Sequence, residues 1–196
     1  MKNIMKKIIL LSGTPGTGKT TIVKLLKSAL PAVVIDINKE VIENQFFTMD
    51  SERETKIADF KKLKPYLEQK IKEIQSEYIL IEGHYADIMP NELVSKIIIL
   101  RTHPEVLKKR LKQKNYSTKK IIENLQAEIL GTCSYHAIKS FETKKIYELD
   151  NSELTIEETV KKIVNLIKEN MNRSSIGKID WLDSLEKTGR LSKYFD

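Results

Sequence analysis

The sequence predicts an α/β protein whose parallel five-stranded sheet lies between two layers of helices. Two observations indicate this fold class: five short apolar runs have the length of buried strands, and helical segments with an apolar face separate most of them. Strands that alternate with helices are typical of a parallel sheet covered on both faces. The chain of 196 residues is long enough for one such domain and a short additional segment.

The first half of the chain contains three of the expected strands and the helices near them. The segment after the second strand is different, because it is polar and irregular from residue 38 to about residue 59. In order, we expect a strand at residues 7–12, a helix at 19–30, a strand at 32–35, a short helix at 41–47, a helix at 60–75 and a strand at 78–81.

The second half contains two further strands, and two of its helices have recognisable starts. Thr102 is followed three residues later by Glu105, and Thr155 by Glu158, which is the spacing of a capping box at a helix N-terminus. In order, we expect a strand at residues 96–100, a helix from residue 102 to 113, a helix over 121–130, a strand at 145–149 and a helix that ends near residue 168.

The composition of the chain changes after residue 169. Residues 170–177 have the polar, glycine-containing composition of a linker, and residues 179–196 form an amphipathic segment with the only tryptophan, Trp181. We expect residues 1–170 to form the core domain and residues 171–196 to be a tail that packs back on it. A tail that binds a partner is the alternative.

Charge and cysteine content restrict the partners and the environment. The formal net charge of +7 favours polyanionic partners, which include nucleotides and RNA. Cys133 is the single cysteine, which excludes a disulfide framework and is typical of a reducing cytoplasm. The apolar runs are far shorter than the ~20 residues of a membrane span, so we expect no membrane association.

A phosphate-binding loop is the most specific motif. Residues 13–20, GTPGTGKT, fit G-x-x-x-x-G-K-[ST] in full between an apolar strand and a helix, and no third glycine follows to suit a dinucleotide. Glycines let the backbone curl so that successive N–H groups point at phosphate oxygens. Lys19 would follow the β- and γ-phosphates of ATP, and the Thr20 hydroxyl would ligate magnesium. The expected phosphate contacts are Gly16, Gly18, Lys19, Thr20 and Thr21.

A carboxylate and a histidine follow at the end of the third strand. In an open parallel sheet ligands bind beyond the carboxyl ends of the strands, so Glu82 is expected to hold magnesium or its waters. An acid that only solvates the strand end is the alternative. His84 could orient or deprotonate a water as a catalytic residue, with Asp87 fixing its tautomer, or it could be structural. We expect His103 and His136 to lie at a helix end or on the surface.

A basic segment follows the fourth strand. Arg101 comes directly after the strand, and Arg110 and Lys114 are four residues apart and share a helix face. Phosphoryl transfer needs cations around the transferring group and exclusion of water, and a lid here would supply both, with Arg110 in a catalytic role. A nucleic-acid-binding patch and a plain solvated helix are the alternatives. The further basic residues are Lys108, Lys109, Lys112, Lys119 and Lys120.

The acceptor nucleotide of a kinase would bind between the second strand and the next helix. Asp36 and Asn38 lie at the mouth of this segment and can hydrogen-bond a nucleoside. Arg53 is the only arginine of the segment, so a phosphate clamp from it has little support. Asp36 as a plain strand terminator is the alternative to a functional role.

Several segments together resemble one protein family. They are GTPGTGKTT, IEGHYAD followed by Pro90, LRTHPEVLKKRLKQKNYSTKKIIENLQAEIL, and IYELDNS before the last core helix. These segments resemble the CINAP-type adenylate kinases, also known as the Fap-type ATPases of small-ribosomal-subunit maturation, over most of residues 7–170. The stretch over residues 101–129 carries the most specific part of the resemblance.

The resemblance implies a three-layer P-loop NTPase fold with strand order 2-3-1-4-5. It also implies a monophosphate-binding segment over about residues 36–59, a lid over about residues 113–123, and MgATP bound by the phosphate loop, Glu82 and Lys114. The family usually has Asp where Glu82 stands, Arg where Lys114 stands and N-V-G-D where residues 36–39 read DINK, so the choice of monophosphate stays open.

The resemblance implies a function as well. It points to transfer of the ATP γ-phosphate to AMP, with dAMP or CMP also accepted, together with ATPase activity. It further implies a small-subunit ribosomal protein and pre-ribosomal RNA as partners, and we expect a monomer. The alternative is an ATPase switch that acts on such a partner with incidental kinase activity. A gluconate-type kinase of small metabolites is a third hypothesis, which the lid sequence disfavours.

Overall fold

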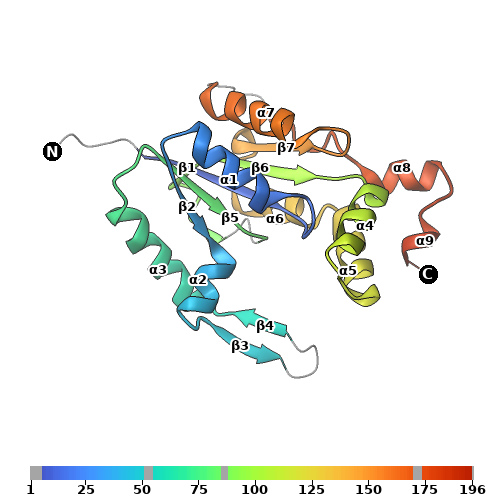
Figure 1. Ribbon diagram of the computed structural model, residues 1–196, viewed down its shortest axis with the longest axis horizontal. Coiled ribbons are helices and arrows are strands. Elements are labelled where there is room, and N and C mark those ends of the chain that lie inside the picture. The colour runs from blue at the N-terminus through green and yellow to red at the C-terminus, as the bar shows by residue number, and fades with distance from the viewer. Residues whose placement is uncertain (1–5, 51–54, 85–87, 170–173, 196) are drawn as a thin grey trace.

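The computed structural model of the protein describes residues 6–50, 55–84, 88–169 and 174–195. The strands of its central sheet are β1 (Lys7–Gly13), β2 (Ala32–Asp36), β5 (Tyr78–Glu82), β6 (Val94–Arg101) and β7 (Ile146–Asp150). They are parallel and lie in the order β2-β5-β1-β6-β7 (Figure 1). Numbered along the chain within this sheet, the order is 2-3-1-4-5, so the predicted fold class and topology are confirmed.

Helices connect these strands and continue beyond the last of them. They are α1 (Lys19–Ala29), α2 (Ile37–Glu43), α3 (Phe60–Glu73), α4 (Pro104–Gln113), α5 (Thr118–Ile129), α6 (Thr132–Ser140), α7 (Ile156–Lys168), α8 (Trp181–Lys187) and α9 (Ser192–Phe195). Most bounds agree with the predicted helices to within two residues. The helix α6 was not expected; it follows Gly131, whose left-handed φ of 62° separates it from α5.

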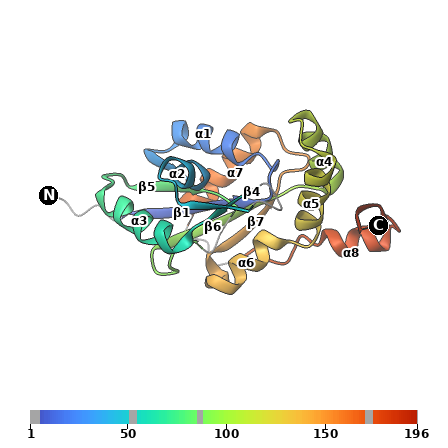
Figure 2. The ribbon, with the colours of Figure 1, turned by 90° about the horizontal axis from the view of Figure 1, so that it is seen from below.

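Two hydrophobic clusters cover the two faces of the sheet, because successive strand residues point to opposite faces. Ile9 and Leu11 of β1 are buried with side chains of α1 and α7. Ile8 and Leu10 are buried on the other face with side chains of α3 and α6. Figure 2 shows α1 and α7 on one side of the sheet and α6 on the other. The core therefore holds the carboxyl ends of β1, β2 and β5 at one edge.

The start of α4 differs from the expectation. His103, not Thr102, is the N-cap, and its side chain accepts a hydrogen bond from the Glu105 amide. Pro104 occupies the first helical position, where its missing N–H is not needed, and this moves the start by one residue. Thr102 instead donates its hydroxyl to Asn151 Oδ1 at 2.6 Å. The second predicted capping box, Thr155 with Glu158, is present as expected.

The segment after β2 also differs from the expectation. The short helix comes earlier, because the Asp36 carboxylate caps α2 directly at the strand end, and Gln45 with φ 55° lies beyond its last turn. The predicted helix over residues 41–47 is therefore wrong in its second half. The following residues form an antiparallel hairpin of β3 (Phe47–Asp50) and β4 (Thr55–Ala58), which projects from the sheet (Figure 1).

The last two helices, α8 and α9, pack against the core domain. Leu185 of α8 and Tyr194 of α9 are buried in a third cluster with side chains of α4 and α5. Before α8, the Ser174 and Ser175 hydroxyls hydrogen-bond backbone groups of β7, the last strand of the sheet. In the ranges that the structure describes, no helix combines the length and apolar character needed to cross a membrane.

Candidate active site

The phosphate loop lies between β1 and α1 and is packed against α4. Gly16 and Gly18 have φ of 92° and 99°, a left-handed conformation that favours glycine. A Cβ atom on Gly16 would lie 2.9 Å from side-chain carbons of both Leu107 and Leu111, so the loop touches α4 closely. Position 16 therefore requires glycine both for its left-handed backbone conformation and because a side chain would collide with α4.

Lys19 lies inside the loop. Its Nζ donates to the carbonyls of Gly13 at 2.6 Å and Thr14 at 3.0 Å, and its side chain is buried. Burial lowers the pKa of Lys19 to about 8, while the carboxylates of Glu82 and Glu128 counteract the shift. The ammonium therefore remains mostly protonated at pH 7 and is held by the carbonyls of Gly13 and Thr14.

A cavity of about 170 Å³ lies over the loop at the carboxyl edge of the sheet. It brings together every residue that the sequence singled out for phosphate, metal and acceptor binding. Its lining also contains residues that the sequence did not single out, of which Tyr116 comes from the α4–α5 connection. The lining residues are Pro15, Gly16, Gly18, Lys19, Thr20, Thr21, Asp36, Asn38, Glu82, Gly83, His84, Lys114 and Tyr116.

Glu82 and Asp36 form a pair of carboxylates in this cavity. They are register partners at the ends of β5 and β2. Within the described residues, Glu82 Oε2 is the one buried side-chain oxygen or nitrogen without a hydrogen-bond partner. Burial and the Asp36 carboxylate raise the pKa of Glu82, and the nearby Thr20 hydroxyl counteracts this. An unpartnered carboxylate oxygen beside a hydroxyl fits a magnesium ion, which takes one or two protein oxygens with phosphates and waters.

His84 is a neutral imidazole in the wall of the cavity. Its Nδ1 lies 3.3 Å from the Gly13 carbonyl, so the proton is on Nδ1 and Nε2 is the acceptor. Burial, reinforced by the charge of Lys19, lowers the pKa of His84 to about 4. Asp87, the expected partner of this ring, lies outside the described residues, and the Gly13 carbonyl fixes the tautomer here.

The other two histidines have the positions expected for them. His103 is the N-cap of α4, and His136 is exposed on α6.

Arg101 is the last residue of β6 and does not line the first cavity, which corrects the expectation of a cation available to the phosphates from its place after the predicted strand. Its guanidinium is buried and pairs with Glu128 at 2.8 Å and with Glu148 at 2.7 Å. Both acids come from elements far along the chain, so no local sequence signal identified them. The cation at this strand end is thus neutralised inside the core.

Arg110 and Lys114 lie on a second cavity, of about 330 Å³, between the loop and α7. Arg110 contacts Asn151, donating to its carbonyl at 3.2 Å, and Lys114 lines both cavities. Asn151 was missed by the sequence reasoning; its side chain donates to the Thr17 carbonyl at 2.7 Å. The second cavity is lined by Gly16, Thr17, Gly18, Thr21, Ile22, Arg110, Gln113, Lys114, Asn151, Leu154, Ile156 and Thr159.

One wall of the first cavity is formed by the start of α2. Asp36 Oδ1 accepts a hydrogen bond from the Lys39 amide at 3.2 Å, so this side chain both ends the strand and lines the cavity. Asn38 lines the same wall. Arg53 lies outside the described residues.

Comparison with known proteins identifies the family to which this chain belongs. A family model described as "AAA domain" matches residues 9–131. A protein of Methanocaldococcus jannaschii named "Putative adenylate kinase" is 36% identical over 189 residues, which cover 96% of this chain and 95% of that protein. The chain belongs to this family of adenylate-kinase homologues. A family member of the same name from Methanosarcina barkeri is 36% identical over 185 residues, 90% of this chain and 98% of its own.

Solved structures share the fold of this adenylate-kinase homologue. A shikimate kinase from Bacteroides thetaiotaomicron has a TM-score of 0.57 at 18% identity and covers 83% of this chain and 99% of its own. A thymidylate kinase from Candida albicans has a TM-score of 0.55 at 16% identity, over 86% of this chain and 93% of its own. The adenylate-kinase homologue is therefore a nucleotide-binding P-loop protein of the kinase type.

Proposed function

We propose that the protein is a nucleoside-monophosphate kinase that transfers the γ-phosphate of ATP to AMP, with dAMP and CMP as further acceptors. One observation carries the proposal: a single cavity unites the phosphate loop, the Glu82 and Asp36 carboxylates and Lys114. The name of relatives at 36% identity supports AMP as acceptor.

ATP would span the two cavities. Its triphosphate would follow the amides of the loop, with Lys19 between the β- and γ-phosphates. Its base and ribose would enter the larger second cavity, whose lining combines apolar Leu154 and Ile156 with polar Arg110 and Asn151. Arg110 is anchored to Asn151 beside this cavity, so we propose that it orients the nucleoside of ATP, in place of the catalytic role expected from the sequence.

Magnesium would arrive with ATP, and Thr20 and Glu82 are the residues that would hold it. Bound magnesium would supply positive charge that offsets the negative charge of the phosphates. The unpartnered Oε2 of Glu82 supports this assignment. The acceptor would lie against Asp36 and Asn38 within a segment of about residues 36–59. Lys114, in a lid of about residues 113–123, would close over the phosphates and exclude water.

ATP hydrolysis is a second activity that one observation favours. His84 keeps its Nε2 lone pair above pH 4, because its pKa lies near that value, and it lines the phosphate cavity. A neutral imidazole there can accept a hydrogen bond from an attacking water and orient it, while its pKa near 4 makes it a weak proton acceptor at pH 7. With the resemblance to CINAP-type proteins, this supports an alternative function as an ATPase switch on a small-subunit ribosomal protein or pre-ribosomal RNA. We propose a cytoplasmic monomer in either case.

Product analysis separates the two functions. Kinase transfer converts ATP and AMP into two ADP without inorganic phosphate, whereas hydrolysis yields one ADP and one phosphate. We expect ADP formation from MgATP to rise at least about tenfold when AMP is added, a change that corresponds to about 1.4 kcal/mol in the barrier. The same assay with dAMP and CMP gives the acceptor range. ADP formation that AMP does not accelerate, accompanied by equal phosphate release, would reject the kinase in favour of the switch.

A further inference from the structure

Glu128 is a buried carboxylate that no step of the proposed reaction uses. It lies on α5 behind the phosphate loop and is 2% exposed. Its Oε1 accepts from Arg101 Nε at 2.8 Å and from the Thr102 amide at 3.0 Å. Its Oε2 accepts from the Thr14 hydroxyl at 2.5 Å. One carboxylate thus joins the end of β6 to the first turn of the phosphate loop.

Thr14 passes this contact on to the loop. The same residue accepts, through its backbone carbonyl, hydrogen bonds from Lys19 Nζ at 3.0 Å and from the Thr17 hydroxyl at 2.9 Å. Thr14 is buried and lies outside the lining of both cavities described above. Glu128 therefore contacts the loop from outside both cavities.

The C-terminal segment, residues 174–195, completes the network around Glu128. Trp181 donates its indole N–H to Glu128 Oε1 at 3.3 Å. The Arg101 guanidinium pairs with Glu148, whose second carboxylate oxygen accepts from the Gly177 amide at 2.9 Å. The segment thus contacts both acids that hold Arg101. Figure 1 shows α8 and α9 beside α4 and α5, on the side away from the hairpin.

We infer that Glu128 is a positioning residue that joins the C-terminal segment to the phosphate loop, so that the docking of this segment raises the affinity of the loop for nucleotide phosphates. The inference rests on the proposed function, because it assumes nucleotide at the loop. An anion nest binds well only when its amides already converge. A loop that is no longer held through Thr14 spends less time in that conformation, and apparent affinity falls by the same fraction.

The inference predicts a change in affinity at unchanged stoichiometry. Calorimetry with MgADP on the full chain measures both quantities, for Thr14→Val, which lacks the hydroxyl, and Thr14→Ser, which keeps it. We expect Thr14→Val to weaken binding about tenfold, equivalent to about 1.4 kcal/mol, and Thr14→Ser to bind within about twofold of wild type. A merely structural role would instead lower the fraction of binding-competent protein and leave the dissociation constant of the remainder unchanged.

A substitution at Trp181 tests the contact between the C-terminal segment and Glu128 while the contacts of the phosphate loop stay in place. Trp181→Phe keeps an aromatic ring but loses the N–H, and Glu128 Oε1 retains two other donors, so we expect about threefold weaker MgADP binding, or about 0.6 kcal/mol. Lys187→Ala is the control, because Lys187 lies on the same helix in an exposed pair with Asp183. In the wild type, MgADP should change the emission of Trp181, the only tryptophan, since coupling is reciprocal.

The outcomes distinguish this inference from the proposed function. Wild-type affinity in Thr14→Val, or wild-type affinity in Trp181→Phe together with an unresponsive Trp181 emission, would overturn the inference and leave the kinase intact. A well-folded wild type that binds no MgADP would refute the proposed function and the inference with it.

Discussion

The two walls of the proposed site are built in different ways. The phosphate loop has buried side chains at Thr14, Thr17 and Lys19, is packed against α4 and is tied through Thr14 to the Arg101–Glu128 pair. The acceptor wall is tied down mainly at α2, where the buried Glu40 pairs with Lys70 of α3 at 2.6 Å.

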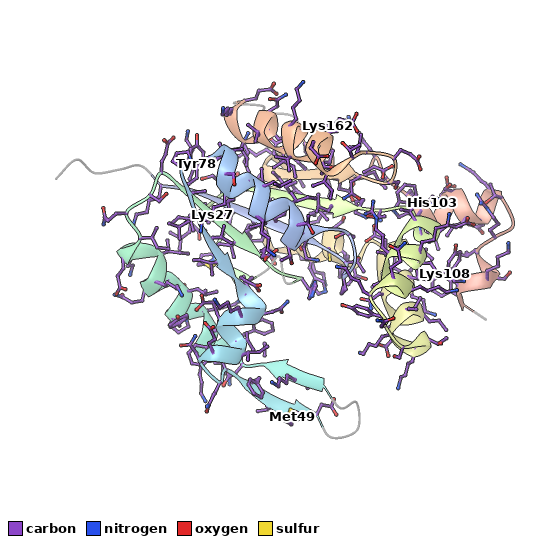
Figure 3. The ribbon with its side chains drawn as sticks, viewed as in Figure 1. Lys27, Met49, Tyr78, His103, Lys108 and Lys162 are labelled. Atoms are coloured by element: carbon purple, nitrogen blue, oxygen red, sulfur yellow. The ribbon has the colours of Figure 1, made fainter. Side chains whose placement is uncertain are left out.

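Beyond α2 the hairpin exposes large apolar side chains, with Met49 62% and Ile57 51% exposed. Figure 3 shows Met49 on the hairpin at one end of the molecule. The comparison shows that the phosphate loop is fixed by buried contacts, whereas the proposed acceptor wall is fixed at α2 and continues into a hairpin with exposed side chains. Changes at the loop should therefore affect every reaction of the protein, whereas changes at the acceptor wall should affect one substrate.

The largest effect is expected for Lys19→Ala. Removal of the buried ammonium should lower kcat/KM for ATP by about 10³-fold in both transfer and hydrolysis, because a preorganised charge is lost from the phosphates. Lys39→Ala on the exposed surface of α2 is the control, since Lys39 pairs only with Glu43 of the same helix among the contacts found in the described residues. Steady-state kinetics of ADP formation measure both, and an unchanged Lys19→Ala turnover would refute the loop as the phosphate site.

His84→Ala should separate the rate of ATP hydrolysis from the affinity for nucleotide. We expect hydrolysis to fall by about 10²-fold, because the group that orients the attacking water is lost, while the dissociation constant for MgATP stays within about twofold. The exposed His136→Ala variant is the control. If affinity fell and the rate of hydrolysis at saturation did not, His84 would be a binding residue.

The pH dependence tests the buried charge of Lys19 directly. Its pKa is lowered to about 8, so the free protein loses this proton as the pH rises through 8, and kcat/KM for ATP should fall about tenfold per pH unit above that value. No decline should arise from His84 between pH 5 and 8, because its pKa of about 4 keeps it neutral throughout. A profile that is flat from pH 7 to 9.5 would contradict a site that depends on the Lys19 ammonium.

The smallest effect is expected at the acceptor wall. Asn38→Ala should raise KM for AMP about fivefold, the effect of one hydrogen bond of about 1 kcal/mol, with KM for ATP unchanged. Glu43→Gln, on the same helix, should change neither value. Equal changes in both Michaelis constants would show that this wall is not specific for the acceptor.

Much of this architecture could be predicted because its signals are local. The strands are continuous apolar runs, and the loop needs glycines at fixed spacing, so the sheet was predicted correctly and the structure brings the expected phosphate, metal and acceptor residues to one cavity. The partners of Arg101 could not be identified, since Glu128 and Glu148 come to it through the packing of distant elements. The hairpin was missed because β3 and β4 are only four residues each and carry no long apolar run.

The serines beside β7 have a consequence for the behaviour of the protein at high concentration. The terminal strand of a sheet offers free backbone donors and acceptors to strands of other molecules. Here the Ser174 hydroxyl donates a hydrogen bond to the Ile146 carbonyl. The Ser175 hydroxyl donates to the Glu148 carbonyl and accepts from the Glu148 amide. Two small side chains thus take up three backbone groups that this border of the sheet would otherwise offer to an added strand.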